Sequence, residues 1–272
     1  MDTHHLLISG SIDTEVILPD IAYMRTYIAN VCFVGDPVSG HWMLVDTGVA
    51  TCGDDIKKYA DARFGRPPIH ILLTHGHFDH VGNVIALADY WDVPIYAHKN
   101  ELPFLTGQQD YPPGDSTVGG GIMAVVAPMY PHKAIDLQNR IHPLPADGII
   151  PEMDEWRYIL TPGHTPGHIS LLRDRDKVLI AGDAFITVKQ ESALAVMQQE
   201  KEIHGPPTYF TPDWDTAKDS IVRLAKLPIA LAITGHGVPM SGEELTEGLQ
   251  LLAQNFDSQA IPEQGRYVNE KE

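Results

Sequence analysis

The sequence predicts an α/β fold in which two mixed β-sheets pack face to face and are flanked by helices, an αββα four-layer sandwich. Two observations support this expectation. Short runs of apolar and β-branched residues alternate along the chain with segments of helical periodicity. The two halves share this alternation, so each half is expected to supply one sheet and its covering helices. With 272 residues, we expect a single domain over residues 1–272.

The first half is expected to form the opening sheet and two helices. Its predicted strands are residues 6–9, 27–34, 42–45, 69–73 and 94–97. A helix is predicted over residues 56–64, because Gly65 and the following prolines would end it there. A second helix is predicted over residues 81–91, where apolar residues recur at helical spacing.

The second half repeats the same alternation of strands and helices. Its predicted strands are residues 157–160, 169–173, 178–181 and 229–233. Helices are predicted over residues 214–227, with Asp213 as the N-cap, and over residues 243–255. The tail from Ile261 is polar and is expected to fray.

A Pro- and Gly-rich region, residues 106–131, separates the two halves. Loops of this length without secondary structure are usually functional or disordered. The apolar stretch 122–126 within it favours a flap docked near the site, or a contact in a homodimer, over a solvated linker. A plain connection between the two halves is the alternative.

Composition excludes several kinds of partner. The chain carries 19 Lys and Arg against 36 Asp and Glu, a net charge of −17, which disfavours nucleic acid. No apolar run approaches the ~20 residues that a membrane span needs. The start of the chain lacks the pattern of a secretory signal, and Cys32 and Cys52 are expected to be reduced thiols. These features predict a cytoplasmic protein that acts on a small molecule.

The chemistry is concentrated in residues 74–80, directly after the predicted strand 69–73. This segment holds His75, His77, Asp79 and His80. In an extended backbone, side chains two residues apart point to the same side. The last two residues would turn back towards the same space at the start of the next helix. Imidazoles and a carboxylate at this density favour zinc, with iron or manganese as alternatives.

Three later strand ends carry a metal-capable side chain beside glycine. His164, with His168 four residues further on, follows strand 157–160, while Asp183 follows strand 178–181 and His236 follows strand 229–233. Glycine allows the backbone to turn sharply and to approach a centre closely. The four strand ends are therefore expected to converge on one rim of the sandwich.

The run His75-Gly76-His77-Phe78-Asp79-His80, with His164, Asp183 and His236 downstream, resembles the metallo-β-lactamase superfamily of metal-dependent hydrolases in order and spacing. Asp46-Thr47-Gly48 is similar to the turn that follows an early strand in that family. The resemblance extends from about Tyr27 to His236. It implies the αββα sandwich that the alternation of elements already predicts.

The resemblance also implies a role for each ligand. His75, His77 and His164 would bind a first metal, and Asp79, His80 and His236 a second, with Asp183 bridging them. Two divalent ions, Zn²⁺ before Fe or Mn, would share a water that loses its proton near neutral pH. Asp79 and Asp183 are the implied catalytic residues. Asp79 would steer the hydroxide and help to protonate the leaving group, and Asp46 is expected to orient a ligand histidine.

Four residues are expected to form the substrate pocket: Phe78, His168, Tyr209 and Phe210. His168 either lies behind the ligands or forms pocket wall. Tyr209 is a candidate for the tyrosine with which lactonases of the family hold a substrate oxygen. The cluster of Tyr209, Phe210 and Trp214 forms either pocket wall or core.

Differences between this sequence and other branches of the superfamily narrow the expected activity to hydrolysis of a lactone or a thioester. True β-lactamases of the family commonly have Cys or Ser where this chain has Asp183. Thioesterases similar to glyoxalase II share the Pro-Gly-His-Thr run at residues 162–165, but for glutathione this chain offers only Lys189 as an obvious basic residue.

Two other classes of function stay open. A mononuclear iron persulfide dioxygenase, an oxidoreductase, would need only His75, His164 and Asp183. A binding protein with a structural metal is the second alternative. A structural zinc site is usually closed by four ligands, whereas this chain offers seven candidates.

Overall fold

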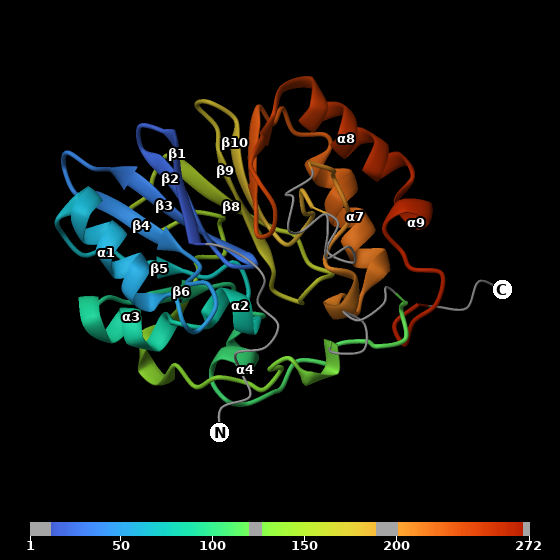
Figure 1. The fold of residues 1–272 in the computed structure, drawn as a ribbon, viewed down its shortest axis with the longest axis horizontal. Coiled ribbons are helices and arrows are strands. Elements are labelled where there is room, and N and C mark those ends of the chain that lie inside the picture. The colour runs from blue at the N-terminus through green and yellow to red at the C-terminus, as the bar shows by residue number, and fades with distance from the viewer. Residues whose placement is uncertain (1–11, 120–126, 189–200, 269–272) are drawn as a thin grey trace.

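The computed structural model describes residues 12–119, 127–188 and 201–268. The strand predicted at residues 6–9, the apolar stretch 122–126 and Lys189 lie outside these described residues. The described strands form two sheets with helices on their outer faces (Figure 1). No helix in the described ranges is long and apolar enough to cross a bilayer.

The first sheet has seven strands in chain order, β1 to β7. They are β1 (Ile12–Leu18), β2 (Ile21–Thr26), β3 (Ala29–Asp36), β4 (His41–Val45), β5 (Ile71–Leu72), β6 (Ile95–Ala97) and β7 (Ile141–Pro143). Strands β1 to β4 pair antiparallel, and β4 to β7 pair parallel. Val45 of β4 lies opposite Leu72 of β5, so the segments after these strands begin side by side.

The second sheet has five strands in the order β12-β11-β10-β9-β8. They are β8 (Trp156–Leu160), β9 (Ile169–Arg173), β10 (Val178–Gly182), β11 (Leu231–Thr234) and β12 (Met240–Ser241). Only β10 and β11 pair parallel within it, with Gly182 opposite Thr234. Both sheets are therefore mixed, as the sequence predicts.

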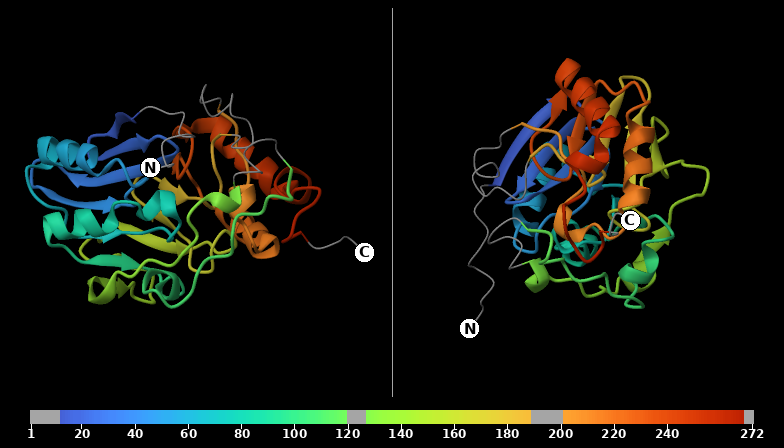
Figure 2. Two further views of the ribbon diagram at one scale, coloured as in Figure 1. Left: turned by 60° about the horizontal axis from the view of Figure 1, so that its bottom comes forward. Right: turned by 90° about the vertical axis from the view of Figure 1, so that its right-hand side faces the viewer.

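Three buried clusters separate the four layers. The first joins one face of the seven-stranded sheet to α1 (Gly53–Phe64) and α3 (Val84–Trp91). The second lies between the sheets, where Val45 meets Ile180 and Ile233. The third joins the five-stranded sheet to α7 (Trp214–Leu224), α8 (Gly242–Gln254) and α9 (Phe256–Gln259). The layers run from α1 and α3 at the left of Figure 1 to α7 and α8 at the right, and the left view of Figure 2 shows the same order. The predicted αββα sandwich is confirmed.

Several elements differ from the sequence prediction. The hairpin of β1 and β2 and the short strands β7 and β12 were not predicted. Strand β2 is buried along nearly its whole length between its neighbours, so it lacks the alternation that marks a half-exposed strand. The strand expected at residues 27–34 starts later, at Ala29, because Tyr27 adopts a left-handed conformation (φ 68°) in the preceding turn.

The helix expected over residues 81–91 is split. Helix α2 (Phe78–Val81) ends at Gly82, and α3 begins at Val84. The Asn83 side chain donates to the carbonyls of Thr47 and Val49, both at 2.6 Å. A Cβ at Gly82 would overlap the backbone of residues 48–50. The chain is therefore held against the turn after β4, which interrupts the helix and fixes the approach of the loop before it.

The ends of the second half agree only in part with the prediction. Asp213 is the N-cap of α7 and accepts from the backbone N–H of Thr216 at 3.0 Å, as predicted. The tail does not fray over its described residues. The backbone N–H of Arg266 donates to Asp115 at 2.5 Å, and the Tyr267 hydroxyl donates to the Pro113 carbonyl at 3.3 Å. Residues 261–268 thus pack onto the described residues 113–118 of the region 106–131.

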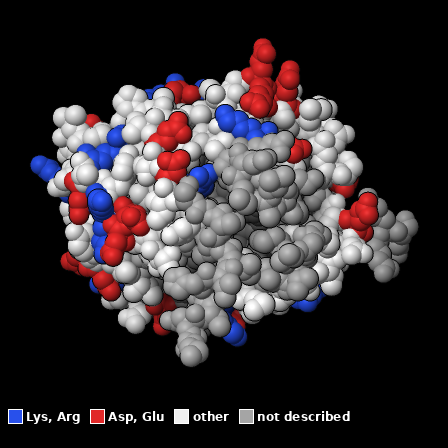
Figure 3. All heavy atoms as spheres, in the orientation of Figure 1, with Lys and Arg blue, Asp and Glu red and all other residues white. Residues whose placement is uncertain are grey.

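Acidic and basic side chains are interspersed on the face seen in Figure 3, most clearly over α1 and α3 at its left. The described ion pairs include Lys57 with Asp54 at 2.6 Å and Arg140 with Asp89 at 2.9 Å. The described basic groups on this face therefore lie next to carboxylates and do not form a patch of their own.

Candidate metal centre

The predicted ligands meet where strands of both sheets end. His75, His77, Asp79 and His80 follow β5 of the first sheet, whereas His164, Asp183 and His236 follow β8, β10 and β11 of the second. All seven residues are buried, with at most 8% of their surface exposed. Ligands from both halves of the chain are thus brought into one place.

The ligand atoms form three overlapping groups, in each of which they lie within 4.8 Å of one another. The groups are His75, His77 and His164; His75, His80 and Asp183; and Asp79, His80 and His236. Asp183 Oδ2 lies 3.4 Å from His164 Nε2 and 3.1 Å from His236 Nε2. This carboxylate therefore lies between the first group and the third.

Hydrogen bonds on the far side of the rings orient the histidines. His236 Nδ1 donates to the Ile28 carbonyl at 2.6 Å, and His80 Nδ1 donates to Asp46 at 2.8 Å. His164 Nδ1 lies 3.1 Å from the hydroxyl of Thr211, which itself donates to the Pro207 carbonyl. With Nδ1 engaged in this way, each ring directs Nε2 to the centre, which is how ligand histidines are commonly held.

Asp46 orients a second histidine through Thr74. Its carboxylate accepts from the Thr74 backbone N–H at 2.8 Å and from the Thr74 hydroxyl at 2.7 Å. The same hydroxyl lies 3.0 Å from His75 Nδ1 and is placed to accept from it. Asp46 adopts a left-handed conformation (φ 61°) in the turn after β4, which brings one carboxylate to both histidines.

The donor set fits divalent cations. His75 Nε2, His80 Nε2 and Asp183 Oδ1 are buried without a hydrogen-bond partner in the described part of the chain. His77 Nδ1 and His164 Nε2 face each other at 2.8 Å. Buried polar atoms of this kind are costly unless something binds them. Imidazole nitrogens and carboxylates are ligands that zinc, iron and manganese accept.

Burial also sets the protonation of this cluster. It lowers the pKa of His75 and His164 well below the usual value and that of His77 to about 3. Burial alone would raise the pKa of Asp183, but the His236 and His80 imidazoles hold it well below its usual range. Burial would also lower the pKa of His80 and His236, but the Asp183 carboxylate outweighs it and raises both. Neutral imidazole and ionised carboxylate are the forms that bind metal, so His75, His77, His164 and Asp183 are already in the binding form, whereas His80 and His236 would lose a proton on binding.

His168 lies behind the bridging position and has no exposed surface. Its Nε2 accepts from the backbone N–H of Asp183 at 2.8 Å, and its Nδ1 donates to the Thr161 carbonyl at 3.1 Å. Of the two roles that the sequence left open, this position matches support of a ligand rather than pocket wall.

Glu101 is a buried residue of the site that the sequence analysis missed. Its Oε1 accepts from the Thr165 hydroxyl and the Gly167 N–H, both at 2.7 Å. Its Oε2 accepts from the Gly76 N–H at 3.2 Å and from the Tyr111 hydroxyl. Burial raises the pKa of Glu101, an effect that these four donors oppose. Its carboxylate joins the loop of His75 and His77 to the loop of His164.

Aromatic side chains surround the ligands. Phe78 stacks on Tyr130 with ring centroids 5.0 Å apart, and Phe210 lies 6.4 Å from Phe78. Tyr111 lies edge-on to His77 at 4.7 Å. Tyr111 and Tyr130 both belong to region 106–131, so the described parts of this region contribute to the surroundings of the site. The sequence offered no periodicity or motif by which to find them.

Tyr209 and Trp214, which the sequence left open as pocket wall or core, are both buried in apolar clusters. Tyr209 is 3% exposed and packs with Ala127 and Phe210 in a small cluster. Trp214 belongs to the core between α7 and the five-stranded sheet, where its ring lies 6.4 Å from Phe256.

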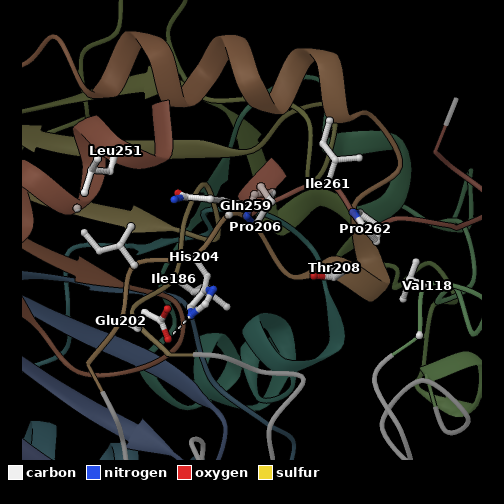
Figure 4. Close-up of a pocket in the computed structure, with 15 residues that line it drawn as sticks. Val118, Ile186, Glu202, His204, Pro206, Thr208, Leu251, Gln259, Ile261 and Pro262 are labelled. Atoms are coloured by element: carbon white, nitrogen blue, oxygen red, sulfur yellow. Dashed lines mark ion pairs between the residues drawn. The ribbon is translucent and has the colours of Figure 1, made fainter. Parts of the chain in front are cut away.

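Two cavities lie in this part of the molecule. A cavity of about 100 Å³ is lined by His77, His164 and Phe210 together with aromatic and proline side chains, but not by Tyr209. A larger one of about 520 Å³ is lined by residues such as Ile186, His204 and Leu251, with the Glu202–His204 ion pair on its wall (Figure 4). None of the seven candidate ligands lines the larger cavity. Of these two cavities, formed by described residues, the smaller one reaches the candidate metal centre.

Comparisons with known proteins agree with this geometry. A family model described as the metallo-beta-lactamase superfamily matches residues 25–236. The chain is 46% identical over 238 residues to the probable metallo-hydrolase YflN of Bacillus subtilis, covering 86% of this chain and 90% of YflN. It is 30% identical over 115 residues to the hydroxyacylglutathione hydrolase GloC of Haemophilus influenzae, covering 42% of this chain and 49% of GloC. A beta-lactamase from Chitinophaga pinensis has a similar fold, with a TM-score of 0.62 and 17% identity over 94% of this chain and 97% of that one.

Proposed function

The chain belongs to the metallo-beta-lactamase superfamily, and from this premise we propose that it is a dinuclear metal-dependent hydrolase of a small ester-like substrate, a lactone or a thioester. The observation that carries the proposal is the overlap of the three ligand groups, with Asp183 between two of them. One cation needs only one such group. The presence of a further complete group supports a second cation close to the first.

The proposed cofactors are two divalent ions, with Zn²⁺ before Fe or Mn. His75, His77 and His164 would hold one, and Asp79, His80 and His236 the other, with Asp183 shared. When bound, the ions supply an activated water and polarise the oxygen of the scissile bond. The far nitrogens of His236, His164 and His80 are already engaged, which leaves Nε2 of each ring to serve as the ligand.

Asp79 is proposed to handle the proton of the reaction. Its Oδ2 lies 3.6 Å from His236 Nε2 and 4.0 Å from His80 Nε2, and its side chain retains some exposure, unlike that of His80. A carboxylate there can orient the attacking water and pass a proton to the leaving group. Asp183 is proposed to keep the two ligand groups in register, since it contacts both.

The ester-like substrate rests on two lines of support. GloC, which the chain resembles over part of its length, is named for hydrolysis of a thioester, hydroxyacylglutathione. Asp183 stands where a true β-lactamase of the family commonly has Cys or Ser, which favours the lactonase and thioesterase branches over cleavage of a β-lactam.

The first test is proton release at constant pH, with and without a chelator, on a panel of a lactone, a thioester, a phosphodiester and a β-lactam. We expect chelator-sensitive acid release from the lactone or the thioester, and two metal ions per chain after reconstitution. Hydrolysis that survives complete metal removal would refute the proposal, as would a single ion per active chain. Oxygen uptake with a persulfide would instead establish the mononuclear iron dioxygenase.

A cytoplasmic location and a small-molecule substrate are part of the same proposal. Cys32 and Cys52 are both buried and unpaired, which suits a reducing compartment. Neither thiol lies among the candidate ligands. Labelling both thiols after denaturation of protein taken directly from cells tests whether they are reduced there.

A further inference from the structure

The small cavity beside His77 and His164 is an apolar slot in the wall of the metal centre. We propose that this slot takes the apolar end of the substrate, a short alkyl chain or a single ring on the acyl side, and that it selects against an anionic group. This inference rests on the proposed hydrolase function, because it assigns a substrate class to that site.

The lining of the slot is almost free of charge. Besides the two histidines it consists of the aromatic residues Phe104, Tyr111, Phe210 and Tyr267, four prolines and the amide of Gln109. None of these is Lys, Arg, Asp or Glu. Arg266 is exposed and places its guanidinium 5.8 Å from the Tyr267 ring, outside the lining. A carboxylate entering the slot would lose its water without gaining a cationic side chain from the lining.

The walls of the slot are already formed without a ligand. Phe104 stacks on Tyr111 with ring centroids 4.1 Å apart and an interplanar angle of 8°. The Tyr111 hydroxyl donates to Glu101, and the Tyr267 hydroxyl donates to the Pro113 carbonyl. Because side chains held in this way lose little freedom on binding, an apolar group gains most of its transfer free energy there.

The volume limits what fits. The slot encloses about 100 Å³, and an engineered apolar cavity of about 150 Å³ is known to hold benzene. A chain of a few methylenes or one ring is therefore the largest group expected. Since the slot opens on two ligands of the first group, the carbonyl carbon next to this chain would lie at the metal centre.

The experiment uses thioesters of one neutral thiol, N-acetylcysteamine, with acyl chains from acetyl to octanoyl, on the metal-loaded protein. We expect kcat/KM to rise about threefold to fourfold per methylene and then to level off as the slot fills. The succinyl thioester is expected to be at least tenfold poorer than the butyryl thioester, which has the same number of carbons. A flat series, or a preference for succinyl, would overturn the proposal.

Substitutions of Tyr267 test whether the slot causes the dependence of kcat/KM on acyl-chain length. Tyr267→Ala removes one wall and should flatten the chain-length dependence, whereas Tyr267→Phe keeps the ring and should preserve it. Tyr90→Ala is the matched control, because Tyr90 is an exposed residue of α3. A chain-length dependence that is unchanged in Tyr267→Ala would assign the selectivity to another surface and reject the slot.

A binding measurement separates the slot from the reaction. Fluorobenzene is titrated into the metal-free protein and followed by ¹⁹F line broadening. We expect saturable broadening with the wild type and Tyr90→Ala, and at least fivefold weaker binding with Tyr267→Ala. If no thioester is hydrolysed, the proposed function fails and this measurement alone decides. Equal binding to all three proteins, or binding to none, would reject the slot.

Discussion

The carboxylate of Glu101 accepts a hydrogen bond from the backbone N–H of Gly167 at 2.7 Å. Through its other oxygen it also accepts from Gly76, which lies between the candidate ligands His75 and His77. Gly76 lies in a loop of the first sheet and Gly167 in a loop of the second. The buried side chain of Glu101 therefore fixes the distance between the two loops. A Cβ at Gly167 would lie 2.7 Å from the Glu101 backbone nitrogen, which shows how closely the segments approach.

Glu101→Gln is expected to weaken metal binding by roughly ten- to a hundredfold. The amide keeps the shape of the side chain but turns one acceptor into a donor that faces other donors, and such a mismatch in a buried site costs about 1–3 kcal/mol. Metal affinity is measured by competition with a chromophoric chelator. The control is Glu247→Gln on the exposed face of α8. Unchanged affinity in Glu101→Gln would show that the loops keep their places without this carboxylate.

Asp183→Ala is expected to abolish turnover and to lower the bound metal to at most one ion per chain. The substitution removes the carboxylate that contacts both His164 and His236. Metal analysis of the purified protein and initial rates on the active substrate measure the two effects. Asp219→Ala, on the exposed side of α7, is the control. A fully active Asp183→Ala variant would contradict the assignment of this residue.

Gly235→Ala is expected to reduce metal content more than it reduces folding stability. A Cβ at this position would overlap Asp183 Oδ1 and would lie 2.9 Å from the His80 ring. The carboxylate must therefore move away from its place between the ligand groups. Metal stoichiometry and chemical unfolding of the metal-free variant are compared with the wild type. A variant with full metal content would mean that Asp183 can bridge from another rotamer.

His70→Leu is expected to make the protein more resistant to acid. His70 is 1% exposed and neither ring nitrogen has a hydrogen-bond partner among the described residues. Burial lowers the pKa of His70 to about 4, with a smaller contribution from His41. The unfolded chain, with a pKa near 6.5, therefore binds the proton more readily, and stability is lost as the pH falls from about 6.5 towards 4.

The size of the expected change in unfolding free energy follows from the lowered pKa of His70. The difference in unfolding free energy between His70→Leu and the wild type is measured at pH 7.5 and at pH 4.5. On going to pH 4.5 this difference should shift by about 2.5 kcal/mol in favour of the variant. Urea unfolding of both proteins at the two pH values measures it, with metal removed so that the ligand histidines contribute equally. If the difference between the proteins does not change with pH, the pKa of His70 is not lowered in the folded state.

The meeting of the candidate ligands could be predicted from the sequence, because His75, His164, Asp183 and His236 each come after an apolar strand and strand ends gather on one rim. Their proposed roles as ligands came from the resemblance in order and spacing to the metallo-β-lactamase superfamily. The fold followed from the same alternation of strands and helices. The split between α2 and α3 could not be predicted, since it depends on hydrogen bonds from Asn83 to Thr47 and Val49 in the turn after β4.

The wall of the site was harder to predict for a physical reason. Tyr111, Tyr130 and Tyr267 come from segments without regular periodicity, and only tertiary packing brings them to the ligands. Glu101 illustrates the same limit. Its partners Gly76, Tyr111, Thr165 and Gly167 come from three segments, so nothing next to it in the chain distinguishes it from an ordinary surface carboxylate.

The position of the ligands on both sheets has a mechanical consequence. Ions bound by His75 and His77 from one sheet and by His164 from the other would join distant parts of the chain, as a disulfide does. Sliding of one sheet across the other would then require a coordination bond to break. The metal-loaded protein should unfold as one cooperative unit, and after removal of metal the seam between Val45 and Ile233 is where the two halves would first come apart.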